Sequence, residues 1–108
     1  QGFSYLAKKA HDHGSRIYGA TIMPCGNTEY SEKWMQAFEK TRRDVNQWIR
    51  TQSVYDGYFD FDDILKNDTV PAYLKEEVHI GDGLHPNTMG GKILAECVDL
   101  SMLTGLDD

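Results

Sequence analysis

The fold follows from one apolar run, Arg16-Ile17-Tyr18-Gly19-Ala20-Thr21-Ile22-Met23, which is rich in β-forming residues and almost free of charge. Gly14 precedes the run and Pro24 ends it. A continuous apolar run between such residues is typical of a strand buried on both faces, as in parallel sheets. The sequence therefore predicts a buried strand over residues 16–23.

Helical patterns lie on both sides of this strand. Residues 5–13 are compatible with a helix that Gly14 ends, because glycine accepts a left-handed conformation without a Cβ clash. A longer helix is predicted over residues 31–52, with Ser31 as its N-cap. Its apolar residues recur at three- and four-residue steps, which favours packing in the core over a ligand platform built from the two tryptophans. This predicted inner stripe comprises Trp34, Phe38, Thr41, Val45, Trp48 and Ile49.

A second strand is predicted over residues 58–61, followed by a turn or short helix over residues 62–65. The resulting order of helix, strand, helix and strand predicts an α/β fold, with a parallel sheet and helices packed on its faces. Residues 67–78 are interpreted as a surface excursion with one helical turn around Tyr73 and Leu74.

A final helix is predicted from Thr88 to Leu103, with Asn87 as its N-cap and Gly105 as its end. Its predicted inner stripe comprises Ile93, Leu94, Cys97, Val98 and Ser101 or Met102. Because 108 residues suffice for one modest core and no repeat or linker interrupts them, we expect one domain over residues 1–108, or a large piece of one.

The composition argues against several classes of function. Apolar residues make up 40% of the chain and charged residues 26%, which favours a soluble globular fold over a disordered or fibrous one. A net charge of -6 predicts neither a nucleic-acid nor a membrane partner, because phosphates and anionic lipids would repel it. No CxxC or HExxH signature occurs, so we predict no metal and no cofactor. Cys25 and Cys97 are interpreted as free thiols, with a disulfide as the open alternative.

The chemistry is concentrated in His79-Ile80-Gly81-Asp82-Gly83-Leu84-His85-Pro86-Asn87, a Gly-rich segment that leads into a helix. A catalytic histidine needs one ring nitrogen free to take a proton and the other held by an acceptor. In a turn, the carboxylate of Asp82 can reach the ring of His85 three residues later, and Gly81 and Gly83 allow the tight backbone path. Asp82 and His85 are therefore the candidate catalytic residues.

A structural role for this pair stays open, because an Asp-x-x-His pair also closes turns and caps helices. The other three histidines lie beside charged residues and are interpreted as solvated side chains rather than ligands. They are His11, His13 and His79.

The run from Gly81 to Asn87, followed by a helix, resembles the last sequence block of the SGNH (GDSL-type) hydrolases, in which Asp and His are three apart and precede Pro. Residues 19–24 resemble that family's penultimate strand, residues 45–50 its long helix and residues 56–62 its last strand. The similarity runs from about Arg16 to the end, and it is closest to the branch of carbohydrate-deacetylating esterases.

The resemblance implies a three-layer α/β/α sandwich around a parallel sheet, of flavodoxin-like type, whose N-terminal strands are missing from these residues. The chain would then be the C-terminal segment of a single hydrolase domain. The resemblance also implies Ser-His-Asp acyl transfer on an acylated carbohydrate or another small ester. In that reaction Asp82 orients the imidazole, and His85 acts first as general base and then as general acid.

The family's nucleophile and oxyanion-hole blocks do not occur in this chain. No serine lies in a Gly-Asp-Ser setting and no asparagine in a Gly-x-Asn-Asp setting; the residues concerned are Ser4, Ser15, Ser31, Ser53, Ser101, Asn27, Asn46 and Asn67. We therefore expect the isolated chain to be inert. We expect the exposed sheet to be covered by the missing N-terminal portion or by self-association. The alternative is a non-catalytic binding or assembly module that keeps the later half of the fold.

Overall fold

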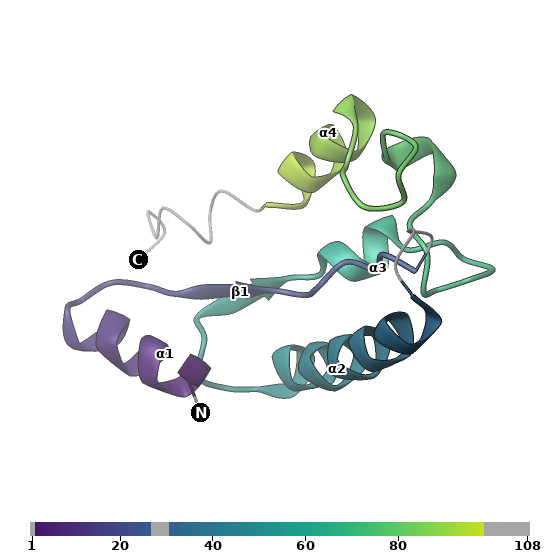
Figure 1. Cartoon of the computed structure of the whole chain (residues 1–108). Coiled ribbons are helices and arrows are strands. Elements are labelled where there is room, and N and C mark those ends of the chain that lie inside the picture. The colour runs from purple at the N-terminus through teal and green to yellow at the C-terminus, as the bar shows by residue number, and fades with distance from the viewer. Residues whose placement is uncertain (1, 27–30, 99–108) are drawn as a thin grey trace.

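The computed structural model describes residues 2–26 and 31–98 and has a mixed α/β architecture (Figure 1). The predicted alternation of helices and strands is confirmed. The last helix ends earlier than predicted, at Cys97, because Val98 adopts an extended backbone conformation, and Leu103 and Gly105 lie outside the described residues. The elements in chain order are α1 (Gly2–Asp12), β1 (Tyr18–Ala20), α2 (Glu32–Thr51), β2 (Gly57–Phe59), α3 (Phe61–Leu65), the 3-10 helix η1 (Glu76–Val78) and α4 (Thr88–Cys97).

Strands β1 and β2 pair in parallel, with Tyr18 opposite Gly57 and Ala20 opposite Phe59. The predicted parallel pairing is confirmed, and α2 supplies the crossover that parallel strands require. Strand β1 is shorter than the predicted run, because its partner β2 ends at Phe59 and the chain turns into α3. Asp60 caps α3 by accepting a hydrogen bond from the backbone N–H of Asp63.

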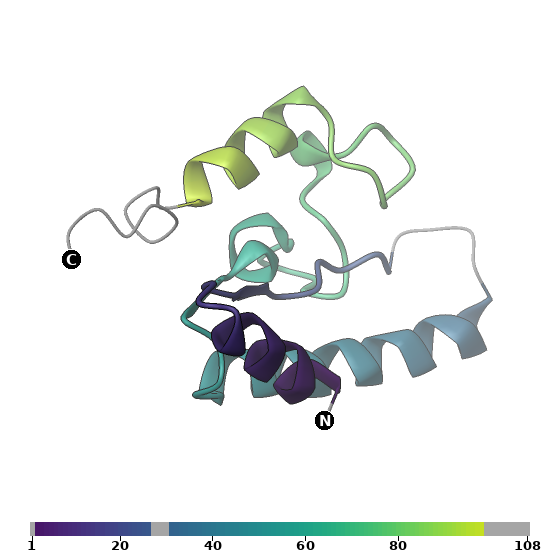
Figure 2. The ribbon, with the colours of Figure 1, turned by 90° about the vertical axis from the view of Figure 1, so that its left-hand side faces the viewer.

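Helices cover both faces of the strands. Helices α1 and α2 lie on one side and α4 lies on the other, in both views of the chain (Figures 1 and 2). The main apolar core joins α3, η1 and α4, and the predicted inward positions of Ile93 and Leu94 on α4 are confirmed. It consists of the buried residues Leu65, Leu74 and Val78, against which Met23, Ile64, Ile93 and Leu94 pack.

Residues 67–78 run largely over the surface, as their sequence predicts, but two of their apolar side chains are buried. Leu74 is 1% exposed and Val78 is fully buried. The segment folds back because Lys66 and Leu74 form an antiparallel bridge, which carries Leu74 inward. The helical turn is η1, so it lies after Tyr73 and Leu74 rather than around them.

Helix α2 begins and ends where the sequence predicts, but it buries a different face. The Ser31 hydroxyl accepts the backbone N–H of Trp34 at 3.2 Å, as expected of an N-cap. Only part of the predicted apolar stripe is buried: Trp34 is 45% exposed, whereas Arg42, Asn46 and Ile49 face the interior. Of the rest of that stripe, Thr41 is exposed and Phe38, Val45 and Trp48 are half-buried.

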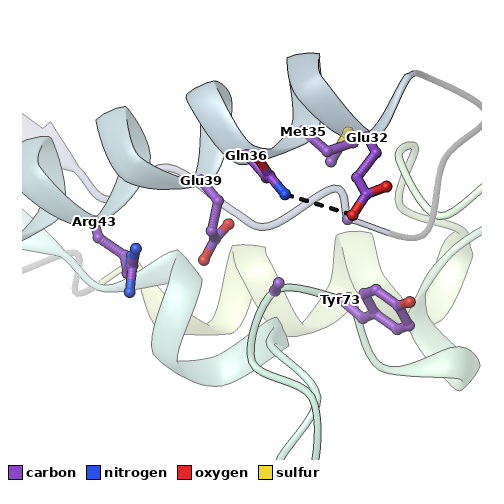
Figure 3. Close-up of a pocket in the computed structure, with 8 residues that line it drawn as sticks. Glu32, Met35, Gln36, Glu39, Arg43 and Tyr73 are labelled. Atoms are coloured by element: carbon purple, nitrogen blue, oxygen red, sulfur yellow. Dashed lines mark hydrogen bonds between the residues drawn. The ribbon is translucent and has the colours of Figure 1, made fainter.

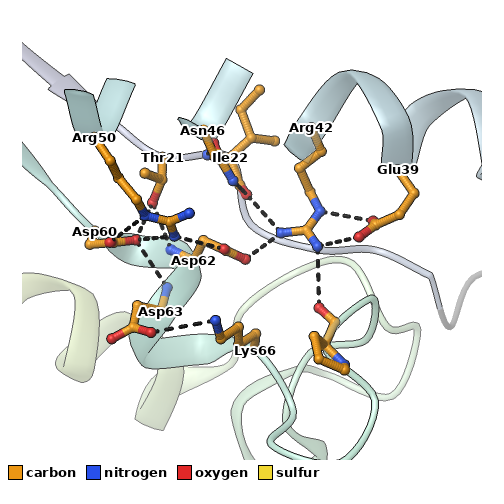
Figure 4. Close-up of polar contacts among 11 residues, drawn as sticks. Thr21, Ile22, Glu39, Arg42, Asn46, Arg50, Asp60, Asp62, Asp63 and Lys66 are labelled. Carbon is orange, nitrogen blue, oxygen red and sulfur yellow. Dashed lines mark hydrogen bonds and ion pairs between the residues drawn. The ribbon is translucent and has the colours of Figure 1, made fainter. Parts of the chain in front are cut away.

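Arg42 faces inward because acceptors from distant parts of the chain surround its guanidinium (Figure 4). It forms ion pairs with Glu39 and with Asp62, and it donates to the carbonyl oxygen of Pro71 at 3.2 Å. The Arg42 and Asp62 side chains are 3% and 6% exposed. A buried charge persists when it is paired and hydrogen-bonded, which this arrangement achieves.

A second arginine extends this polar network to the ends of the strands. Arg50 donates to both carboxylate oxygens of Asp60 at 2.7 Å and to Asp62 at 2.9 Å. The hydrogen bond from Arg50 holds the pKa of Asp60 below its ordinary value. The Thr21 hydroxyl donates to Asp60 and accepts the backbone N–H of Asp62, both at 2.9 Å. The carboxyl ends of β1 and β2 are thereby fixed to α2.

Candidate catalytic site

The predicted catalytic residues lie on a loop between η1 and α4. An antiparallel bridge between His79 and Pro86 closes the base of this loop, and the backbone N–H of Ile80 donates to the carbonyl oxygen of His85 at 3.0 Å. Gly81 and Gly83 have φ angles of +112° and +71°, a region that side-chain-bearing residues rarely adopt. The tight backbone path predicted for the two glycines is confirmed.

The structure brings Asp82 and His85 into direct contact. Nδ1 of His85 and Oδ2 of Asp82 are 2.5 Å apart, so the predicted pairing is confirmed as geometry. The other carboxylate oxygen, Oδ1, accepts the backbone N–H groups of Leu84 and His85, each at 2.9 Å. The His85 side chain, and then these two N–H groups, hold the pKa of Asp82 well below its ordinary value. Asp82 is therefore ionised at neutral pH.

This contact determines which ring nitrogen of His85 is available for chemistry. Because Oδ2 of an ionised Asp82 can only accept, Nδ1 of His85 carries the proton, which leaves a lone pair on Nε2 of the neutral ring. The His85 side chain is 67% exposed, and no group among residues 2–26 and 31–98 forms a hydrogen bond with Nε2. The arrangement thus presents an oriented, accessible proton acceptor.

Asn87 fixes the loop to its neighbouring helices. Its Oδ1 accepts the backbone N–H of Gly90 at 2.9 Å, which confirms its predicted role as the N-cap of α4. Its Nδ2 donates to the carbonyl oxygens of Glu77 and His79, at 2.9 and 3.2 Å. One side chain therefore joins η1, the loop and α4.

A hollow of about 350 Å³ adjoins the loop at the carboxyl end of β1. Leu84, the residue before His85, lines one side of it. The rings of Trp34 and Phe38 line another side and are stacked, with centroids 5.3 Å apart and planes 7° apart. The remaining lining residues are Thr21, Ile22, Met23, Pro24 and Cys25.

A second hollow, of about 340 Å³, lies between α2 and the segment that carries Tyr73 (Figure 3). Charged and polar side chains of α2 line much of it, among them Glu32, Gln36, Glu39 and Arg43. No residue of the loop between His79 and Pro86 lines this hollow. It is therefore separate from the Asp82–His85 pair.

No nucleophile accompanies the pair in the described part of the chain, where no serine, threonine or cysteine side chain forms a hydrogen bond with His85. Cys25 lines the hollow beside Leu84, but burial raises the pKa of its thiol, which disfavours the reactive thiolate. Cys25 and Cys97 are both free thiols, as the sequence predicts.

Sequence reasoning missed one residue of this loop. His79 is not a solvated side chain: its Nδ1 accepts the backbone N–H groups of Gly81 at 3.0 Å and Gly83 at 3.1 Å. The pattern His-x-Gly-x-Gly is the sequence signal that could have found it, because glycines with positive φ turn their N–H groups toward a preceding acceptor. His11 and His13 are exposed, as predicted, although His11 contacts Asp56 at 2.9 Å.

No family model and no curated protein matches this chain. Within the described residues, no helix is long and apolar enough to cross a bilayer. The same residues contain no cluster of three or more His, Cys, Asp or Glu side chains that could hold a metal ion.

Proposed function

We propose that this chain supplies the Asp–His part of a Ser-His-Asp ester hydrolase. The observation that carries the proposal is the contact between Oδ2 of Asp82 and Nδ1 of His85, which leaves Nε2 exposed as a proton acceptor. A carboxylate that holds one ring nitrogen while the other remains available is the arrangement that nucleophilic hydrolases use.

In the proposed reaction, Nε2 of His85 takes the proton of a serine hydroxyl as the serine oxygen attacks the ester carbonyl carbon. Asp82 stabilises the imidazolium that forms. When the C–O bond to the alcohol breaks, His85 returns the proton to the leaving alkoxide, and an acyl-enzyme remains. Water then repeats the sequence, with His85 again taking and returning a proton, and releases the acid.

The serine and the oxyanion donors come, in this proposal, from an N-terminal portion that completes the domain. The resemblance to SGNH hydrolases and the helices on both faces of β1 and β2 support a three-layer sandwich of flavodoxin-like type. In the described residues β1 and β2 pair only with each other, which leaves the outer edges of both strands for further parallel strands. The isolated chain is then inert, since each missing oxyanion donor is worth about 3 kcal/mol.

The hollow beside Leu84 supports a small ester, such as an acylated carbohydrate, as the substrate. Its volume of about 350 Å³ is at the small end of ligand sites, and its lining is mainly apolar. It also lies beyond the carboxyl end of β1, where α/β sheets hold their ligands. None of the described residues that line it is charged, which favours a neutral substrate.

The test is hydrolysis of p-nitrophenyl acetate by this chain and by a longer chain that includes the residues encoded before Gln1. We expect background rates for the former and catalysis by the latter. His85→Ala and Asp82→Ala in the longer chain should each lower kcat/KM by about 10³- to 10⁴-fold. His13→Ala, which removes an exposed histidine just after α1, serves as the matched control and should leave the rate unchanged.

Full activity of His85→Ala would refute the assignment. A longer chain without a Gly-Asp-Ser block and without hydrolysis would instead favour the binding or assembly module. That alternative is supported by exposed apolar side chains that could contact a partner, such as Trp34, Leu6 and Met89, which are 45%, 54% and 53% exposed.

A further inference from the structure

His79 shares the loop with the Asp82–His85 pair, yet the proposed reaction gives it no role. Its Nδ1 accepts the backbone N–H groups of Gly81 and Gly83, the residues on either side of Asp82. Its carbonyl oxygen accepts from Asn87, and its backbone forms the bridge to Pro86. The residue is thus bound to the loop through both its ring and its backbone.

These two hydrogen bonds set the protonation state of the His79 ring. A nitrogen that accepts two N–H groups carries no proton, so the ring is the neutral tautomer with its hydrogen on Nε2. Nε2 is buried and has no hydrogen-bond partner among the described residues. An unpaired buried donor costs free energy, so the contacts at Nδ1 must compensate for it if His79 is to stay in this position.

We propose that His79 is a positioning residue for the catalytic pair. By holding the N–H groups of Gly81 and Gly83, the residues on either side of Asp82, its Nδ1 aims the carboxylate at Nδ1 of His85. The consequence for catalysis rests on the proposed function, whereas the effect on the loop does not. His79 itself touches neither carboxylate oxygen of Asp82 nor the ring of His85 through a hydrogen bond.

Protonation of His79 would act directly on this arrangement. An imidazolium carries a hydrogen on both ring nitrogens, so Nδ1 could no longer accept the two glycine N–H groups. Three donors would then point at one another, and the loop would have to open. The ionisable residues on the flanking elements are Glu76 and Glu77 on η1, Asp82 and His85 on the loop, and Lys92 on α4. None of them forms a hydrogen bond or an ion pair with the His79 ring.

The substitution that isolates this role is His79→Asn. The Oδ1 of asparagine can take the place of Nδ1 as an acceptor for both glycine N–H groups, and it does not titrate. His79→Leu has a similar apolar volume but no acceptor. His13→Asn is the matched control, because Nδ1 of this exposed histidine binds the carbonyl oxygen of Lys9 on α1, away from the loop.

The experiment is nuclear magnetic resonance on the ¹⁵N-labelled 108-residue chain. We expect ring ¹⁵N shifts of His79 that report the Nε2–H tautomer. His79→Asn and His13→Asn should keep the exchange protection of the Gly81 and Gly83 amides, whereas His79→Leu should lower it by about tenfold. Protonation of the His79 ring, followed by its ¹⁵N shifts, should remove this protection in the native chain, whereas His79→Asn, which retains Asp82 and His85, has no ring to protonate.

An Nδ1–H tautomer of His79 would overturn the proposal, as would equal losses of protection in the Asn and Leu variants. If His79→Leu does not fold, the tautomer and the Asn variant still decide the question. None of these measurements requires a serine nucleophile. An intact effect of His79 on the loop, together with an inactive longer chain, would therefore count against the proposed function alone.

In the longer chain, kcat/KM at neutral pH should be retained by His79→Asn and fall by about tenfold or more in His79→Leu, because a displaced carboxylate weakens general-base catalysis. A loss of kcat/KM in His79→Asn as large as the loss in His79→Leu would contradict positioning by His79.

Discussion

Asn46 satisfies both backbone polar groups of Ile22. The N–H of Ile22 donates to Oδ1 of Asn46 at 2.6 Å, and Nδ2 of Asn46 donates to the carbonyl oxygen of Ile22 at 2.9 Å. Asn46 is 1% exposed, so this pairing takes place out of contact with water. A side-chain amide bound in this way occupies hydrogen-bonding groups that a neighbouring strand would otherwise use. It marks where the open edge next to β1 ends.

Loss of this contact should destabilise the chain. Asn46→Ala leaves the N–H of Ile22 without its partner and the carbonyl oxygen with only the 3.4 Å contact from Arg42, so we expect the free energy of unfolding to fall by about 1–3 kcal/mol. Asn46→Asp can accept from the N–H but cannot donate to the carbonyl, and it should also be destabilising. Gln47→Ala, an exposed change one residue later, is the control and should stay within about 0.5 kcal/mol. Urea denaturation followed by circular dichroism measures all three.

The buried and the exposed ion pairs made by α2 should contribute very different amounts to the free energy of unfolding. Arg42→Met removes the partner of the buried Asp62 carboxylate and should cost about 3 kcal/mol, with Arg50 still bound to Asp62. Lys40→Met breaks an ion pair with Asp44 whose side chains are 74% and 64% exposed, and it should cost less than about 1 kcal/mol. Equal losses of stability in the two variants, measured by urea denaturation, would show that burial does not determine how much these ion pairs contribute to the free energy of unfolding.

Two adjacent glycines of α4 should respond oppositely to the same substitution. A methyl group at Gly90 would overlap the carbonyl oxygen of Val78, whereas nothing lies within 4 Å of a methyl group at Gly91. Gly90→Ala should therefore lower stability by about 1–3 kcal/mol through overpacking. Gly91→Ala should raise it by as much as about 1 kcal/mol, because alanine is the better helix former. Thermal unfolding compares them, and a Gly90→Ala protein as stable as the native chain would contradict the close approach of α4 to η1.

The Asp82–His85 contact should weaken in acid. Because the pKa of Asp82 is lowered in the folded chain, its ionised form adds stability above the unfolded-state value of about 3.9. That stability is lost as the pH falls from there through the folded-state pKa. His85→Ala removes the largest cause of the shift and should move the titration of Asp82 back toward its ordinary value. The ¹³C shift of the Asp82 carboxyl group reports both midpoints, and identical midpoints in the two proteins would refute the assigned cause.

The limits of α2 could be predicted from the sequence, but its buried face could not. Ser31 and the three- and four-residue spacing act within the helix itself, so local sequence decides where it begins and ends. The inward turn of Arg42 depends on Asp62 and Pro71, which are 20 and 29 residues away along the chain. From sequence alone, a charged residue on a helix is predicted to be exposed to solvent, because its distant partners are not known.

The contact between Asp82 and His85 could be predicted because it is local. Asp82 and His85 are three residues apart, and the glycines that the turn requires are visible in the sequence. His79 was misjudged because its bonding partners are backbone N–H groups, and the only trace of them in the sequence is the His-x-Gly-x-Gly spacing. Leu74 was placed on the surface because its inward direction depends on the bridge to Lys66 rather than on a periodic pattern.

The hydrogen bonds that shape the loop around Asp82 and His85 all arise between Glu77 and Gly90. In the proposed hydrolase, reactivity and selectivity would therefore be encoded in different parts of the chain, since most of the hollow beside Leu84 comes from residues 21–25 and from α2. Substitutions at Trp34 or Phe38 can reshape what is accommodated there without disturbing the proton acceptor. Such a division allows one reactive segment to serve many different ligands through changes elsewhere.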